Sequence, residues 1–176
     1  MRFTNLYHKL YGKLVLKNNR GNFSFSVQLT NKASTEPVTS SVCTYINDKP
    51  VVYASFMFQN NKASSIDLSN FNTSNVTNMS YMFKNIKASE LDVSSFNTSK
   101  VTNTKLMFAS MYNLLTIYSS DKFVIDNITD SYNMFNASAK LVGGAGTKYN
   151  GSYVDKTYAR VDGGTNSPGY FTLKTN

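Results

Sequence analysis

A short internal repeat constrains this chain more than any other feature of its sequence. The dipeptide Met-Phe occurs four times, the first three equally spaced and the fourth two positions beyond that spacing: Met57-Phe58, Met82-Phe83, Met107-Phe108 and Met134-Phe135. A β-branched residue stands six positions before each of these methionines: Val51, Val76, Val101 and Ile128. Self-similarity at a fixed period of this length is the signature of stacked repeat architectures.

Each unit predicts one short strand and one short helix. Ile66 and Leu68 alternate with polar neighbours, as Leu91 and Val93 do one unit later, and this is the period of a strand. The following apolar residues fall at offsets 0, 3, 6 and 7, which fit one face of a helix: Val76, Met79, Met82 and Phe83. One such unit cannot bury its own apolar face, but stacked copies can. We therefore expect an α/β repeat in which the Met-Phe pairs share one interior.

The run from Ile66 to Phe83, IDLSNFNTSNVTNMSYMF, resembles the repeats of the BspA-like leucine-rich-repeat surface proteins of bacteria. The end of the chain, from Leu141 to Phe171, looks like the closing segment of such arrays, and the likeness covers roughly residues 50–174. The resemblance implies a short leucine-rich-repeat-like solenoid and a role in attachment or recognition at a surface. Asn72 and Asn97 stand where the family has Asp, which weakens any idea of cation binding along the stack.

Three regions are expected: an N-terminal segment (1–50), the repeats (51–140) and a C-terminal cap (141–176). The first region shows a helical apolar stripe over residues 3–11, followed by alternation over 13–17 and 23–29 that predicts a β-hairpin. This segment either anchors the chain to a larger assembly, such as capsid or tail proteins, or covers the open first turn of the stack. The anchoring candidates are basic and aromatic: Arg2, Phe3, Tyr7, Lys9 and Lys13.

The net charge is +8, and the segment from Met1 to Ser34 contains six basic residues and no acidic one. A basic segment can bind nucleic acid, anionic lipid or an acidic protein, or it can be a solvated face. No nucleic-acid motif accompanies these residues, so we expect no specific nucleic-acid partner. No apolar run approaches the length of a transmembrane helix.

The sequence favours a protein that is not an enzyme and binds no metal or cofactor. The single histidine, His8, has no second His or Cys at ligand spacing, and Cys43 is also alone. Asp67 and Asp92 recur at the period of the repeat, which indicates a polar outer row rather than a catalytic pair.

We expect a recognition or adhesion module that binds a host-surface glycan or protein through one face of the stack. Two outer rows are the candidate contacts, one from the predicted helices (Ser80, Lys105, Tyr132) and one from the strands (Asp67, Asp92, Tyr118). The start at Met1 shows no secretion signal, which favours display on a bacteriophage particle. A purely structural virion protein and a secreted bacterial adhesin fragment are the alternatives.

Overall fold

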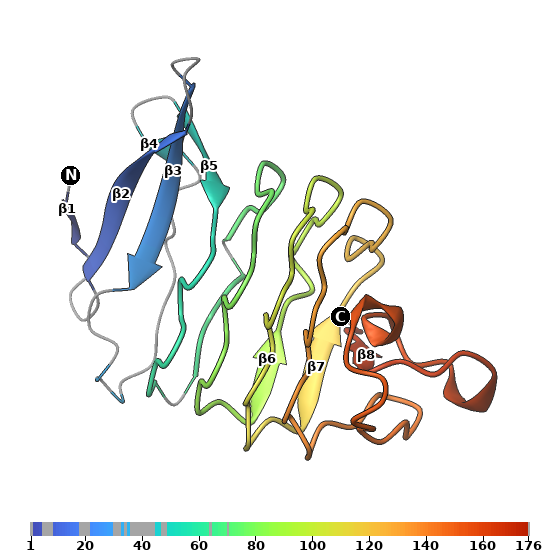
Figure 1. Ribbon diagram of the computed structural model, residues 1–176. Helices are drawn as coiled ribbons and strands as arrows, with labels where there is room; N and C mark the ends of the chain where they lie inside the picture. The colour runs from blue at the N-terminus through green and yellow to red at the C-terminus, as the bar shows by residue number, and fades with distance from the viewer. Residues whose placement is uncertain are drawn as a thin grey trace.

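The chain winds into a row of coils between an N-terminal sheet and a C-terminal cap, as Figure 1 shows for the computed structural model. The structure describes residues 2–4, 9–17, 22–29, 33, 35, 45–46, 49–63, 65–69 and 71–175. One sheet has the strand order β1-β2-β3-β5-β4, and the other has the order β6-β7-β8. The first sheet comprises β1 (Arg2–Thr4), β2 (Lys9–Lys17), β3 (Asn22–Leu29), β4 (Tyr45–Ile46) and β5 (Lys49–Tyr53). The second comprises β6 (Glu90–Asp92), β7 (Thr116–Ser119) and β8 (Phe171–Leu173).

The predicted helix over residues 3–11 is wrong for the residues described there. Phe3 lies in β1 and pairs with Leu10 of β2 in an antiparallel ladder. The apolar residues of this region are equally compatible with strands, because Leu10, Leu14 and Leu16 all stand at even-numbered positions of β2. Pairing with a distant segment decides between helix and strand. β2 continues into an antiparallel hairpin with β3, where the alternating pattern predicts one.

The N-terminal sheet joins the stack of coils through β5. Phe25 of β3 pairs in parallel with Val51 of β5, and Tyr53 at the end of β5 forms a parallel bridge with Asn78 of the next coil. The same bridge recurs from Asn78 to Asn103 and from Asn103 to Asp130. The predicted division at residue 50 thus falls inside a strand that belongs to both regions.

The backbone after each β-branched residue alternates between two kinds of hydrogen bond. The N–H groups of Tyr81 and Phe83 donate to the next coil, to the carbonyls of Lys105 (2.8 Å) and Met107 (3.0 Å). The N–H of Met82, between them, donates three residues back to its own coil, to Met79 O at 3.2 Å. The same alternation continues through the following coil, so each coil is a template for its neighbour.

The alternating strand–helix solenoid predicted from the sequence is wrong: no described residue lies in an α-helix, and β6, β7 and β8 form a small parallel sheet. Each expected helix contains a residue with a positive φ, such as Tyr81 (59°), and a second follows it, such as Asn85 (57°), so a right-handed helix cannot form there. A spacing of three between apolar residues also fits a chain that turns tightly around a core. Hydrogen bonds to the adjacent coils offset the left-handed conformation, which costs about 1–2 kcal/mol per non-glycine residue.

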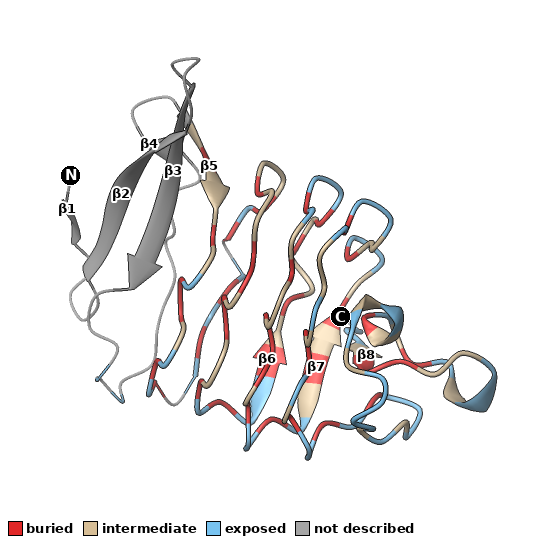
Figure 2. Ribbon diagram, viewed as in Figure 1, coloured by how far each residue is buried: buried red, intermediate tan, exposed pale blue. Residues whose placement is uncertain are grey.

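The core is a set of columns formed by equivalent residues of successive coils. The methionines of all four Met-Phe pairs are fully buried within one hydrophobic cluster, as the repeat predicts: Met57, Met82, Met107 and Met134. The phenylalanine rings stack nearly parallel, with centroids 5.5–5.7 Å apart, from Phe58 through Phe83 and Phe108 to Phe135. Figure 2 shows buried residues recurring at equivalent places along the coils.

The C-terminal cap closes the last coil with aromatic rings and a buried carboxylate. Tyr170 and Phe171 meet the end of the phenylalanine column edge-on, 5.2 and 6.0 Å from the ring of Phe135. The carboxylate of Asp162 accepts backbone N–H bonds from Ala145, Thr147, Gly164 and Gly169, and the hydroxyl of Thr147 donates to it at 2.7 Å. Two short 3-10 helices lie in this cap, η1 (Lys156–Tyr158) and η2 (Gly164–Asn166).

Candidate recognition surfaces

Each coil has two limbs (Figure 1), and buried side chains of both limbs belong to one hydrophobic core. The strand limb contains residues 66–69, 90–94 and 116–120, and includes β6 and β7. The return limb contains residues 51–60, 76–86, 101–111 and 128–138. Leu68 and Leu91 of the strand limb belong to the same cluster as Met82 and Phe83 of the return limb, so the outward side chains of the two limbs face in opposite directions. The two predicted rows therefore form two separate surfaces.

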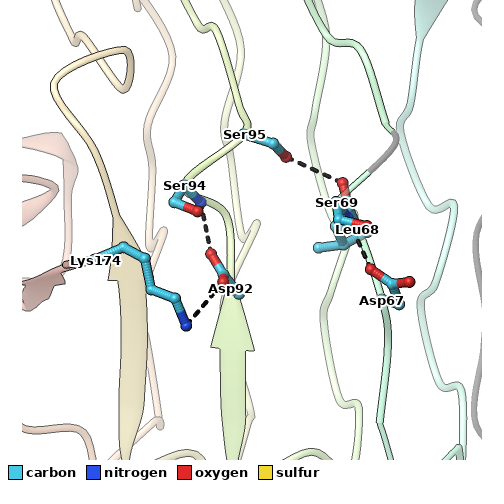
Figure 3. Close-up of polar contacts among 7 residues, drawn as sticks. All are labelled: Asp67, Leu68, Ser69, Asp92, Ser94, Ser95 and Lys174. Atoms are coloured by element: carbon cyan, nitrogen blue, oxygen red, sulfur yellow. Dashed lines mark hydrogen bonds and ion pairs between the residues drawn. The ribbon is translucent and has the colours of Figure 1, made fainter. Parts of the chain in front are cut away.

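The strand limb has a hollow of about 270 Å³ between two adjacent coils. One wall is formed by residues 66–69 and the other by Asp92, Ser94 and Ser95. Figure 3 shows how the hydroxyl of Ser95 donates across it to Leu68 O at 3.0 Å. Asp67 and Asp92 occupy equivalent places, and each accepts the N–H two residues onward at 2.9 Å, from Ser69 and Ser94.

The two aspartates differ in the cation beside them. Lys174, just after β8, reaches back over the ring of Tyr118 (4.6 Å to the centroid) and places its ammonium 3.3 Å from Asp92 Oδ2. Partial burial alone would raise the pKa of Asp92, but hydrogen bonds from Ser94 and the charge of Lys174 outweigh it and hold that pKa below the usual carboxyl range. Asp67 is exposed and lies on the side of Asp92 away from Lys174.

The return limb displays aromatic rings and lysines in coil-to-coil register. The ring of Phe56 stacks on that of Tyr81, with centroids 4.7 Å apart. The ammonium of Lys84 lies 5.5 Å from the centroid of Tyr81, and that of Lys105 lies 5.4 Å from the centroid of Tyr132. Both distances are within the range of cation–π attraction. This surface thus presents two lysine–tyrosine pairs, one within a single coil and one between the next two coils.

The predicted return-limb row is only partly exposed. Tyr132 is 62% exposed and Lys105 is half-buried, but Ser80 is 6% exposed, so its expected outer position is wrong. Lys105 and Tyr132 make the same two backbone bonds as Ser80, so the difference lies in the side chain: the short side chain of serine does not extend past its neighbours as lysine and tyrosine do.

The predicted anchoring residues fall in the N-terminal sheet or outside the described residues. Arg2 and Phe3 lie in β1, and Lys9 and Lys13 lie in β2. Tyr7 lies outside the described residues, as do His8 and Cys43.

Sequence reasoning missed three residues that complete these surfaces. Tyr81 and Lys84 are three positions apart in one unit, and the row of equivalent positions Phe56, Tyr81 and Leu106 signals an aromatic or apolar strip. Lys174 carries no local signal, because its partner Asp92 is 82 positions earlier in the chain.

Within the part of the chain that the structure describes, no three His, Cys, Asp or Glu side chains gather as a metal site would require. No helix among those residues is long and apolar enough to span a bilayer.

A family model described as "Mycoplasma protein of unknown function, DUF285" matches residues 28–153, from β3 to just before η1. The match covers the coils and most of the chain, so this chain belongs to the DUF285 family. No curated protein and no solved structure matches the chain.

Proposed function

We propose that this chain is a non-enzymatic surface recognition module of the BspA-like kind, which binds a host-surface glycan or protein through its return limb. The observation that carries the proposal is a set of ring and lysine contacts along the return limb: Phe56 stacks on Tyr81 of the next coil, Lys84 lies over Tyr81, and Lys105 lies over Tyr132. Tyrosine combines a flat apolar ring with a polar tip, and lysine adds charge, so such a surface contacts extended partners at several points. Membership of the DUF285 family is consistent with this proposal.

The stacked architecture supports binding to an extended partner. Backbone bonds of 2.7–3.0 Å link the return limbs of successive coils, from Tyr81 N–H to Lys105 O and on to Ser110 N–H and Asn136 O. Side chains on such a frame are held in place before a partner arrives, which reduces the entropy lost on binding. Individually weak contacts then add up along the row and across copies of the protein on a surface.

The carrier of the module is a bacterial cell surface or a phage particle in this proposal. The family description names a bacterial genus, which favours the bacterial surface. Immunogold labelling of the producing bacterium and of particles released by its lysis separates the two. Label on intact cells supports the first carrier, and label only on particles supports the second.

Binding of the fluorescent full-length chain to a panel of host cell types tests the proposal, with the chain presented both as a monomer and on beads in many copies. We expect saturable binding that Tyr132→Ala weakens severalfold. Tyr112→Ala is the matched control, since Tyr112 is similarly exposed (59%) but lies at a corner of the coil outside the return limb. Absence of binding to every cell type in both presentations contradicts the proposal, and so does an equal loss for the two variants.

A further inference from the structure

The return limb has an excess of positive charge at its exposed tyrosines. Its charged residues are Lys84, Lys105 and Asp130. Asp130 is occupied locally, because its carboxylate accepts the N–H of Tyr132 at 3.2 Å and the amide of Asn103 at 3.2 Å. The ion pair among the described residues joins Lys174 to Asp92 on the strand limb. The ammonium groups of Lys84 and Lys105 therefore have no carboxylate partner within the described structure.

These two ammonium groups are held in place without being neutralised. Each lies 5.4–5.5 Å from a tyrosine centroid, and both lysines are half-buried. The quadrupole of a ring attracts a cation but leaves its charge free to bind an anion. A lysine already confined over a ring loses less side-chain entropy on binding than a free surface lysine.

The surroundings of the two lysines suit a carbohydrate. Tyr132 is 62% exposed, so a broad area of its ring is open to the solvent for a sugar to stack on. The return limb also exposes amides and hydroxyls, namely Asn60, Thr102, Thr129 and Asn136. The hydroxyls of Thr102 and Thr129 donate to backbone carbonyls of the neighbouring coil, and their oxygens can still accept a bond from a sugar hydroxyl group. Net charge of +8 on the whole chain steers an anionic ligand towards the protein.

We infer that the ligand of the return limb is an acidic glycan, whose carboxylate or sulfate groups bind Lys84 and Lys105 while a sugar ring stacks on Tyr132. This inference rests on the proposed function and names the chemical class of the partner. One lysine–tyrosine pair lies within the coil of residues 76–86, and the other joins the next two coils, so a linear glycan running along the stack reaches both. Binding is then salt-sensitive, because it depends on ionic contacts at the surface.

The test uses the full-length chain and matched glycan pairs immobilised for interferometry: sialylated and desialylated N-glycans, and sulfated glycosaminoglycan fragments beside fragments that are both desulfated and carboxyl-reduced. We expect binding to at least one acidic member and none to its uncharged counterpart. The double variant Lys84→Gln/Lys105→Gln lowers the affinity at least about tenfold, since it removes two charge-assisted contacts. The separate variant Tyr132→Ala also lowers the affinity, and it leaves the salt dependence of binding unchanged.

The double variant Lys62→Gln/Lys87→Gln is the matched control. These two lysines likewise lie in successive repeat units and are exposed, and their loss changes the net charge equally. We expect at most about a twofold loss from it. Equal losses from both double variants overturn the inference, as does equal binding of acidic and uncharged glycans.

Duplex DNA of similar charge serves as a second control. If it binds as tightly and with the same dependence on Tyr132, the surface recognises polyanions generally and the inference fails. The proposed function fails separately, when no cell type is bound. Cell binding without acidic-glycan binding leaves the proposed function standing and removes only this inference.

Discussion

The stack of coils and the C-terminal cap are stabilised in different ways. In the stack, equivalent residues repeat the same contact, so Phe108 packs on both Phe83 and Phe135 and no single residue is unique. In the cap, one buried carboxylate, Asp162, holds two separate segments through Ala145 and Thr147 on one side and Gly164 and Gly169 on the other. A substitution in the stack therefore disturbs the coils on both sides of it, whereas a substitution in the cap disturbs the contacts of one carboxylate.

Replacing Phe108 by Ala is expected to have the largest effect on stability. The ring is fully buried between Phe83 and Phe135, and a large cavity in a core typically costs about 3–5 kcal/mol. Chemical denaturation followed by circular dichroism measures the change in the free energy of unfolding. Phe56→Ala is the control, since Phe56 is 37% exposed, and a loss as large as that of Phe108→Ala contradicts the importance of the inner column.

Replacing Asp162 by Asn is expected to destabilise the cap by about 2–3 kcal/mol, because an amide cannot accept all the bonds that the buried carboxylate accepts. Hydrogen exchange should become faster at the amides of Ala145, Thr147 and Gly164. The amides of Tyr81 and Phe83, which bond between coils, should keep their protection. Equal acceleration in both regions would show that cap and stack unfold as one unit.

The stability of the cap should depend on pH through Asp162, a residue that has no equivalent in the stack. Burial tends to raise the pKa of Asp162, but hydrogen bonds from Thr147, Gly164 and Ala145 lower it to about 2 from an ordinary 3.8. A depressed carboxyl pKa contributes stability above pH 3.8 that is lost as the pH falls towards 2. Denaturation curves between pH 5 and about 2 should therefore show a drop in stability that is smaller in Asp162→Asn, where Asp92 with its own lowered pKa still contributes. A drop of the same size in the variant would assign the effect to other groups.

Replacing Lys174 by Gln tests a contact between cap and stack, and a small effect is expected. The ammonium and the Asp92 carboxylate are each more than 40% exposed, so water and salt screen their attraction. We expect a loss of less than about 1 kcal/mol, which disappears in high salt. The pKa of Asp92 should rise in the variant, as NMR titration of its carboxyl group can show. An unchanged pKa would mean that the pair is not formed in solution.

Replacing Ala137 by Gly is expected to give the smallest effect and the opposite sign. Ala137 has φ of 61°, a conformation that glycine adopts without the steric cost of a Cβ atom. Glycine also gains entropy in the unfolded state, which offsets part of this relief, so we expect a net stabilisation of about 0.5 kcal/mol. Ala139→Gly is the control, because Ala139 is exposed and has no positive φ. The melting temperature of Ala139→Gly should lie below that of the unsubstituted protein, and the melting temperature of Ala137→Gly should equal or exceed that of the unsubstituted protein.

The candidate surfaces were predicted only in part from the sequence. The equivalence of Asp67 with Asp92 and of Lys105 with Tyr132 follows from the repeat, because residues one period apart occupy equivalent places in a stack. Ser80 shares that period and the same backbone bonds yet is buried, since its side chain is too short to extend past its neighbours. Lys174 could not be assigned to Asp92, because no periodicity connects the end of the chain with the middle of the repeat.

The sequence by itself determined the period of the stack and the residues that enter its core, because burial of Met82, Phe83 and their equivalents depends only on which side chains are apolar and how they are spaced. That the segment around Met82 and Phe83 forms a tight turn rather than a helix depends on the tertiary structure. A spacing of three serves both conformations, and the choice depends on bonds such as that from Tyr81 N–H to Lys105 O, which exist only when a second coil is present. Those bonds join residues 24 positions apart, so no local pattern could have revealed them.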